Sequence, residues 1–187
     1  MWHQETNDQN KYPPAVIWLT GLSAAGKTTI ARHLLHLFSE TGNAPVLLDG
    51  DEIRKLHPES SFDEASRKQH NLHVGAMAAT LEKEGKIVIV SVIAPFENIR
   101  NQVRNLCRNY IEVYIATRIE VCIQRDPKGL YKKAIEGSIK DFTGISATYE
   151  TPINPELIID TEIVSVSHNC RLIINCYNLL QKRFATH

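Results

Sequence analysis

The sequence feature that most limits the fold of this chain is an apolar run that leads directly into a glycine-rich stretch. Residues 15–20, AVIWLT, are apolar up to the threonine, as in a strand covered on both faces of a parallel sheet. The next residues, GLSAAGKTT (21–29), match the eight-position P-loop pattern in full from Gly21 onward. A glycine-rich turn is the alternative interpretation. The strand before it and the helical pattern after it favour a P-loop that binds nucleotide phosphates.

Each residue type in this loop suits the binding of a phosphate chain. Several backbone N–H groups must point inward at phosphate oxygens, which requires a tight turn with little side-chain bulk. Lys27, which we expect to be an exposed loop lysine with a catalytic role, supplies positive charge to the outer phosphates, and the Thr28 hydroxyl is a ligand for Mg²⁺. The residues assigned to ATP binding are Gly21, Leu22, Ser23, Ala24, Ala25, Gly26, Lys27, Thr28 and Thr29.

Short apolar runs alternate with longer amphipathic patterns along the chain, and this alternation predicts one α/β domain. The predicted strands are 15–20, 45–49, 86–94, 110–117 and 155–160. The predicted helices are 27–40, 62–84, 98–107, 119–125 and 165–184. We therefore expect a P-loop NTPase-type three-layer α/β/α fold with a parallel five-stranded sheet over residues 15–187, preceded by a flexible polar segment, residues 1–14.

The composition disfavours several other classes of protein. The 187 residues carry a formal net charge of zero, so nothing in the overall charge favours nucleic acid or a membrane surface as a partner. The amino-terminal residues lack the pattern of a signal peptide, and no apolar run approaches the length of a membrane span. The four cysteines lie in apolar contexts, and we expect free thiols in a reducing cytoplasm. His33 and His36 lie on an amphipathic helix and do not indicate a zinc site.

Two carboxylates follow the predicted strand 45–49. Asp49 and Asp51 are separated by Gly50, and residues two apart on an extended or turning backbone can face the same side. We assign both a catalytic role at the carboxyl edge of the sheet, one as a ligand of Mg²⁺ or its water and the other as the acceptor of a proton from an attacking hydroxyl. Turn chemistry is the alternative interpretation of Asp-Gly-Asp. If a helix begins here, Arg54 returns to the same face and contacts an anionic substrate.

A basic segment at about residues 125–145 has the composition of a phosphoryl-transfer lid. Arg125, Lys128 and Lys132 are spaced so that one helical face carries three positive charges, and glycines supply flexible points. A solvated surface helix is the alternative. The sequence contains no Asn-Lys-x-Asp guanine reader, and its length is short for a motor or transporter ATPase, so a small-molecule kinase is the favoured class.

The ordered motifs of the chain resemble the adenylylsulfate kinase (APS kinase) family from about Val16 to Asp160. They are IWLTGLSAAGKTT, LLDGDEIR, KIVIVSVIAPF, IEVYIAT, VCIQRDPKGLYKKA and IKDFTGISATYETPINPEL, of which the last two are far more specific than a P-loop. The resemblance implies that ATP, with Mg²⁺, phosphorylates the ribose 3′-hydroxyl of adenosine 5′-phosphosulfate (APS), giving 3′-phosphoadenosine 5′-phosphosulfate and ADP in sulfate assimilation. It also implies a homodimer and functional coupling to a sulfate adenylyltransferase.

The family's binding residues carry over to this sequence where the motifs match. Phe62 and Phe142 match the aromatic pair that sandwiches the substrate adenine. Arg54 and Arg67 match the arginines that hold the phosphosulfate, and Ile93 matches a substrate-contacting strand end. The resulting substrate-binding set is Asp51, Arg54, Phe62, Arg67, His70, Ile93, Lys128, Lys133 and Phe142. The remaining assignments are Arg125 near the ATP adenine, Thr28 and Asp49 at the metal, and Lys27, Asp49 and Asp51 in catalysis.

Three positions depart from the family's pattern. His70 stands where the family usually has Asn, and Leu72 and His73 stand where two arginines often follow. Ala94 replaces a serine that some members phosphorylate, which excludes a phosphoserine there. The resemblance implies that the helix that carries His70 contacts the acceptor, so a different nucleotide-like acceptor, such as a cytidine nucleotide, is the alternative substrate. A regulatory module that has lost catalysis is disfavoured by the intact P-loop and Asp-Gly-Asp.

Overall fold

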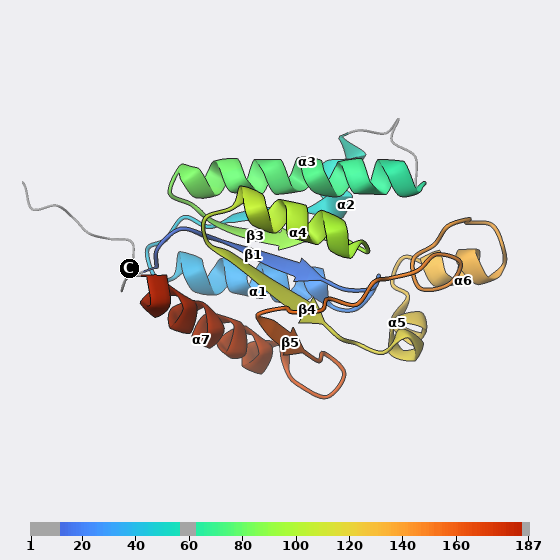
Figure 1. Cartoon of the computed structure of the whole chain (residues 1–187). Helices are drawn as coiled ribbons and strands as arrows, with labels where there is room; N and C mark the ends of the chain where they lie inside the picture. Colours follow the sequence, from blue (N-terminus) through green and yellow to red (C-terminus); the bar gives the residue numbers. More distant parts are fainter. Residues whose placement is uncertain (1–11, 57–62, 185–187) are drawn as a thin grey trace, which may run out of the picture.

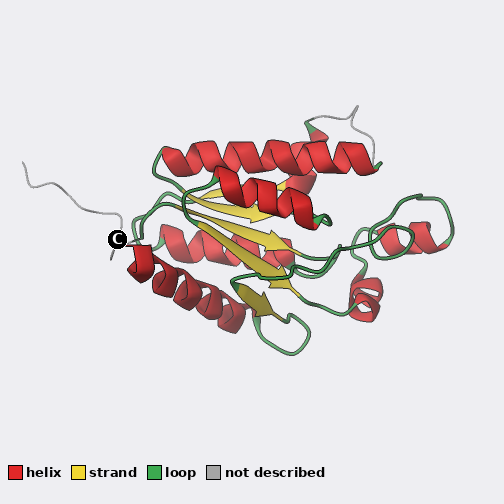
Figure 2. Ribbon diagram, in the orientation of Figure 1, coloured by secondary structure: helices red, strands yellow, loops and turns green. Residues whose placement is uncertain are grey.

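A computed structural model describes residues 12–56 and 63–184, and in it helices cover both faces of one sheet (Figure 1, Figure 2). The strands are β1 (Ala15–Thr20), β2 (Val46–Asp49), β3 (Ile87–Ser91), β4 (Tyr110–Ile115) and β5 (Leu157–Ile159). The helices are α1 (Lys27–Ser39), α2 (Gly50–Lys55), α3 (Glu64–Lys83), α4 (Glu97–Leu106), α5 (Ile119–Arg125), α6 (Leu130–Ile135) and α7 (Val166–Phe184). The strand order is β2-β3-β1-β4-β5, with all neighbours parallel. The predicted three-layer α/β/α fold is confirmed.

Alternate residues of β1 enter two hydrophobic cores, one on each face of the sheet. Ile17 and Leu19 join the core that is shared with α1 and α7, whereas Val16 and Trp18 join the core that is shared with α3 and α4. All four side chains are fully buried. A central strand of this kind has no face toward water, which explains why the run is continuously apolar rather than alternating.

Two short helices were not among the predicted helices, and the largest shift of a strand end is in β3. Helix α2 begins directly after β2 because the Asp49 side chain accepts a hydrogen bond from the Asp51 N–H (2.9 Å), which is a typical N-cap. Helix α6 lies inside the predicted lid, residues 125–145. Strand β3 ends at Ser91 rather than Ala94, where a φ of 46° is outside strand geometry.

The first described residues belong to the polar segment expected to be flexible, and they are packed against the domain. The ring of Tyr12 lies edge-on to Phe38 of α1, with 5.1 Å between centroids, and to Tyr177 of α7, with 5.7 Å. The Tyr177 hydroxyl donates a hydrogen bond to the Pro13 carbonyl. Residues 1–11 lie outside the described part of the chain, so the flexibility expected of them stays a prediction.

Across residues 12–56 and 63–184, no helix combines the length and apolar character that a membrane crossing requires. All four cysteines are free thiols, as predicted: Cys107, Cys122, Cys170 and Cys176. Cys122 and Cys170 are fully buried, and burial raises the pKa of Cys170 to about 12. These thiols therefore stay protonated and pack as small apolar side chains.

A glycine allows α3 and α4 to pack in close contact. A Cβ at Gly75 would lie 2.4 Å from Cγ2 of Val103. We expect Gly75→Ala to lower the free energy of unfolding by about 1 kcal/mol, because overpacking costs about 1–3 kcal/mol and alanine returns about 1 kcal/mol through helix propensity. Urea unfolding measures this change. In a Val103→Ala background the same substitution should cost less, and an equal cost in both backgrounds would contradict this account of the contact.

Candidate active site

The P-loop follows β1 along a backbone path that side chains would block. Gly21 has a φ of 150°, and a Cβ there would lie 2.7 Å from the carbonyl oxygen of Ile115 in β4. Gly26, at the N-cap of α1, has a φ of 100°, and a Cβ there would lie 3.2 Å from the Thr161 side chain. Both glycines are thus required by the geometry. The loop ends at the positive terminus of a thirteen-residue helix, which favours a bound anion.

Lys27 is buried, and the expectation of an exposed loop lysine is wrong. The residue is 8% exposed, and its Nζ donates hydrogen bonds to the carbonyls of Gly21 (3.0 Å) and Leu22 (2.7 Å). Burial lowers the pKa of Lys27 to about 8, against the opposing effects of charges that include Asp51 and Asp49. The loop's own carbonyls therefore hold the ammonium inside the P-loop, where a phosphate oxygen would stabilise its charged form.

Three oxygen-bearing side chains meet at the carboxyl ends of β2 and β3. The Thr28 hydroxyl donates to Asp49 Oδ2 (2.9 Å) and lies 3.3 Å from Ser91 Oγ. Asp49 and Ser91 are register partners, and both are buried. This hard-oxygen set fits Mg²⁺. The described residues contain no group of three or more His, Cys, Asp or Glu that could hold a metal, so phosphate and water oxygens would complete the coordination.

Asp51 has different neighbours from Asp49. The Asp49 Oδ1 atom accepts the Asp51 N–H at the start of α2, and the Asp51 carboxylate forms an ion pair with Lys128 of the lid segment. Burial acts to raise the pKa of Asp51, but Lys128, Lys27 and Arg54 outweigh it and hold the pKa below its ordinary value. Asp49 thus belongs to the oxygen-bearing set at the strand ends, and Asp51 is an ionised group that faces Lys128.

Cationic and neutral nitrogen groups from α2 and α3 surround Asp51. Arg54 interacts electrostatically with Asp51 and with Arg67. His70 forms a hydrogen bond with the Gly50 backbone, and burial together with the Arg54 charge lowers the pKa of His70 to about 4. His70 is therefore neutral at neutral pH. The fold brings together Asp51, Arg54, Arg67 and His70, which the sequence placed in the same substrate-binding set.

Arg67 also borders a cavity of about 730 Å³. Its Nη1 donates to the Thr143 hydroxyl (2.8 Å), and its guanidinium carbon lies 5.5 Å from the centre of the Phe96 ring. The walls of the cavity come from the first turns of α3 and α4 and from residues 141–150. This volume lies within the range of small-molecule sites, and one edge of it is close to the charges around Asp51.

Arg125 is linked to the P-loop through Thr161, and its predicted place near the ATP adenine stays a prediction. At the end of α5, it donates to the hydroxyl (2.9 Å) and carbonyl (2.8 Å) of Thr161. The Thr161 hydroxyl in turn donates to the Ala25 carbonyl of the P-loop (2.7 Å). Thr161 was missed by the sequence analysis because a single threonine after a short strand forms no pattern. Thr29, also assigned to ATP, lines a cavity of about 390 Å³ along α1.

The segment after α6 is connected to the P-loop through aromatic side chains. Phe142 packs edge-on against Tyr131 with 5.0 Å between ring centroids, and the Tyr131 hydroxyl donates to the Ser23 carbonyl (3.1 Å). Phe142 is therefore connected to the P-loop residue Ser23 through Tyr131. Its proposed partner, Phe62, lies outside the described residues, so the sandwich stays a prediction.

The two remaining predicted substrate-binding residues differ in their placement. Ile93 follows β3, and its carbonyl accepts hydrogen bonds from the Thr20 hydroxyl (2.6 Å) and the Gly21 N–H (3.4 Å) at the base of the P-loop. Lys133 is exposed on α6. In the described part of the chain its side chain makes no hydrogen bond or ion pair with another predicted site residue, so its substrate contact remains a prediction.

Comparisons with known proteins show the family of this chain. The family model for adenylylsulphate kinase matches residues 13–160. The probable adenylyl-sulfate kinase of Bacillus subtilis is 42% identical, over 86% of this chain and 86% of that protein, and the adenylyl-sulfate kinase of Vibrio parahaemolyticus is 41% identical, over 98% and 92%. The Mycobacterium tuberculosis APS kinase CysC in complex with AMPPNP and APS gives a TM-score of 0.85 at 31% identity, over 89% of this chain and 99% of that one. This chain belongs to the adenylylsulphate kinase family.

Proposed function

We propose that this enzyme transfers the γ-phosphoryl group of ATP to the ribose 3′-hydroxyl of APS, with Mg²⁺, and releases 3′-phosphoadenosine 5′-phosphosulfate and ADP. The observation that carries this proposal is the division between two neighbouring carboxylates. Asp49 contacts the P-loop Thr28 at 2.9 Å, whereas Asp51 faces Lys128 and lies near Arg54. A phosphoryl transfer to an alcohol uses one carboxylate at the metal and another at the acceptor, and here each has its own environment.

On the donor side, the P-loop binds the phosphate chain of ATP. Lys27 exchanges its hydrogen bonds to the Gly21 and Leu22 carbonyls for phosphate oxygens, which keeps its ammonium paired. Thr28, Asp49 and Ser91 would hold Mg²⁺ directly or through its water, and the bound ion neutralises charge on the phosphates. The backbone N–H groups at the start of α1 bind further phosphate oxygens.

On the acceptor side, Asp51 is the general base. Its depressed pKa keeps the carboxylate ionised at neutral pH, and the 3′-hydroxyl displaces Lys128 from it. The 3′ oxygen forms a bond to the γ-phosphorus while the bond from that phosphorus to the β,γ-bridging oxygen breaks. The hydroxyl proton passes to Asp51, and ADP departs. Arg54 and Arg67 neutralise the phosphosulfate, and Phe142 offers a flat face to the adenine.

Three further assignments accompany the reaction. We place the enzyme in the cytoplasm, where its four free thiols stay reduced. The homodimer stays a prediction from the family resemblance, and light scattering on the purified chain measures it. Functional coupling to a sulfate adenylyltransferase is also a prediction, and it requires only that APS made by that class of enzyme reaches this one.

An ADP-release assay tests the proposed reaction. The purified chain with ATP and Mg²⁺ is given APS, a cytidine nucleotide or no acceptor. We expect saturable turnover with APS and only background ADP release in the other two reactions. Turnover with the cytidine nucleotide but not with APS would show that the cytidine nucleotide is the acceptor. Background release in all three reactions would contradict the assignment as a kinase.

Lys27→Ala should lower kcat by about 10³-fold, because the variant loses a preorganised cation at the transferring phosphoryl group. The melting temperature should not fall, since the native chain desolvates this ammonium and lowers its pKa to about 8. The ADP-release assay and thermal unfolding measure the two effects, with Lys83→Ala on the exposed end of α3 as control. A variant that fails to fold would contradict the role assigned to Lys27.

The neutral state of His70 predicts a specific pH dependence of stability. Its pKa is about 4 in the folded chain and ordinarily near 6.5, so the unfolded chain binds more protons between these values. Wild-type stability should therefore fall as pH decreases from about 6.5 toward about 4. His70→Asn removes this contribution and should lose less stability over the same interval. Urea unfolding at several pH values compares the two proteins, and parallel curves would show that His70 is not the responsible group.

A further inference from the structure

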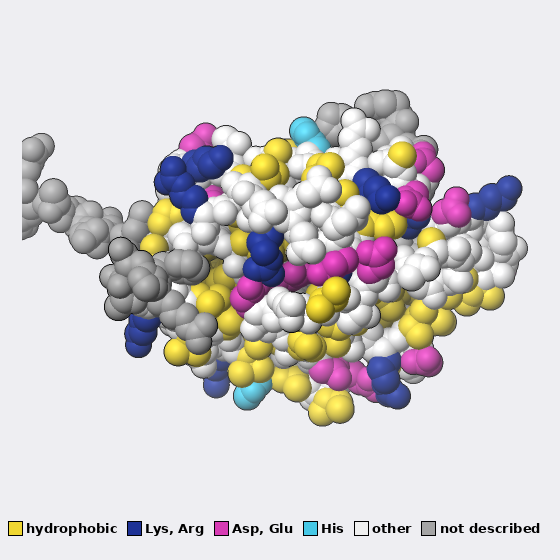
Figure 3. All heavy atoms as spheres, viewed as in Figure 1, with side chains coloured by type: hydrophobic (Ala, Val, Ile, Leu, Met, Phe, Trp, Pro, Cys, Tyr) yellow, Lys and Arg dark blue, Asp and Glu magenta, His cyan; other side chains and the backbone are white. Residues whose placement is uncertain are grey.

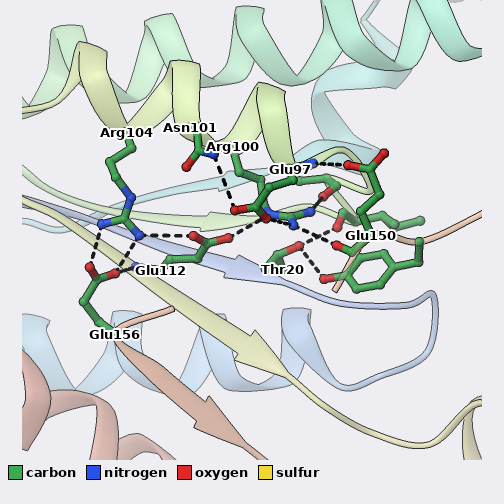
Figure 4. A network of polar contacts seen from close by, with 11 residues as sticks. Thr20, Glu97, Arg100, Asn101, Arg104, Glu112, Glu150 and Glu156 are labelled. Carbon is green, nitrogen blue, oxygen red and sulfur yellow. Dashed lines mark hydrogen bonds and ion pairs between the residues drawn. The ribbon is translucent and has the colours of Figure 1, made fainter. Parts of the chain in front are cut away.

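A fully buried arginine of α4 stands behind the wall of the cavity of about 730 Å³ that Arg67 borders. This cavity is called the acceptor cavity below, because Arg67 is a proposed acceptor-binding residue. The buried arginine is not used by the reaction described above. Arg100 is 0% exposed, and its guanidinium is surrounded by acceptors (Figure 4). Its Nε lies 2.8 Å from Glu112 Oε1, and its Nη2 also contacts the Glu97 carboxylate. The charge is therefore balanced inside the protein by two carboxylates, which makes so deep a burial possible.

The other contacts of Arg100 are with two backbone carbonyls from different walls of the site. Nη1 donates to the carbonyl of Ala94 (2.6 Å), in the turn after β3. Nη2 donates to Glu150 (2.7 Å), at the end of the segment that lines the cavity. The Glu150 N–H bonds to the Pro95 carbonyl (2.9 Å), so the same two segments also meet directly. One guanidinium thus joins the turn after β3 to residues 141–150.

The same connection reaches the base of the P-loop through an aromatic ring. The Arg100 guanidinium carbon lies 5.8 Å from the centre of the Tyr149 ring. The Tyr149 hydroxyl lies 2.9 Å from the Thr20 hydroxyl, which donates to the Ile93 carbonyl (2.6 Å). Thr20 immediately precedes the P-loop. These contacts therefore connect the 141–150 segment, which lines the acceptor cavity, to the start of the P-loop.

We propose that Arg100 is a positioning residue for acceptor binding, which it supports by fixing the turn after β3 and the 141–150 segment relative to each other. The proposal rests on the proposed function, in which Arg67, a residue that borders this cavity, binds the acceptor. The ladder of β3 ends before Ala94, so these loops depend on other hydrogen bonds for their geometry. A planar guanidinium can serve both carbonyls and both carboxylates at once, whereas a lysine ammonium has three donors at one point.

Arg104 supplies a control within the same network. It lies one turn further along α4 and shares Glu112 with Arg100, at 3.1 Å. Its other partners are Glu156, at 2.5 and 3.0 Å, and the Tyr110 ring, at 4.7 Å, and none of these borders the acceptor cavity. Acidic side chains form a row across this face, between α4 and the sheet (Figure 3). The Arg100 end of this network thus contacts residues that line the acceptor cavity, and the Arg104 end does not.

The test compares Arg100→Lys with Arg104→Lys, which both keep the positive charge beside Glu112. We expect Arg100→Lys to raise the KM for the acceptor by about 10-fold, because small displacements of positioning groups have large kinetic effects. Its KM for ATP should change by less than about twofold, since the P-loop is intact. Arg104→Lys should leave both KM values within about twofold of wild type, with thermal stability recorded for both variants. Equal effects of the two variants on the acceptor KM would overturn the proposal.

Two further measurements keep the outcome decisive. If Arg100→Lys does not fold, Tyr149→Phe takes its place, because it removes only one hydroxyl from the same set of contacts. We expect Tyr149→Phe to raise the KM for the acceptor by about threefold. An unchanged KM would overturn the proposal. Hydrogen exchange needs no acceptor. Arg100→Lys, or Tyr149→Phe in its place, should speed amide exchange in residues 142–150 more than Arg104→Lys does, and equal rates would overturn the proposal. Failure of wild-type turnover with APS would instead contradict only the proposed function.

Discussion

All five strands of the sheet run in the same direction, so their carboxyl ends lie along one edge. The central strand β1 is hydrogen-bonded to β3 on one side and to β4 on the other. The P-loop follows the end of β1. Asp49 lies at the end of β2, and its register partner Ser91 lies at the end of β3. The P-loop, Asp49 and Ser91 are therefore brought together by backbone pairing before any side chain contributes.

Local pattern was sufficient for the fold and for much of the site. A continuously apolar run identified β1 because both of its faces are buried, and the spacing of the glycines identified the P-loop because its geometry excludes side chains at those positions. The burial of Lys27 did not follow from the same pattern. It depends on where the Gly21 and Leu22 carbonyls point after the loop has wrapped, which is a property of the folded backbone.

The residues that sequence reasoning missed act through contacts between distant parts of the chain. Thr161 bonds to the Ala25 carbonyl across 136 positions, and Arg100 bonds to Glu150 across 50. Neither belongs to a short motif or a periodic stripe. Ser91 carried a detectable signal, because a hydroxyl at the end of an apolar strand next to a P-loop is a candidate ligand for a phosphate-bound metal. A comparison of the residues at the ends of neighbouring predicted strands would have identified Ser91 together with Asp49.

The cations of the site have partners within the protein that a nucleotide can replace. Lys27 is bonded to the carbonyls of its own loop, and Lys128 is paired with the Asp51 carboxylate. A buried ammonium without a partner is costly, so the carbonyl contacts of the buried Lys27 keep its charge in place at low cost before phosphate oxygens arrive, whereas Lys128 is exposed. Within the proposed reaction, the exchange at Asp51 has a second effect. It frees the base at the step that delivers the acceptor hydroxyl, so substrate binding and activation of the carboxylate become one event.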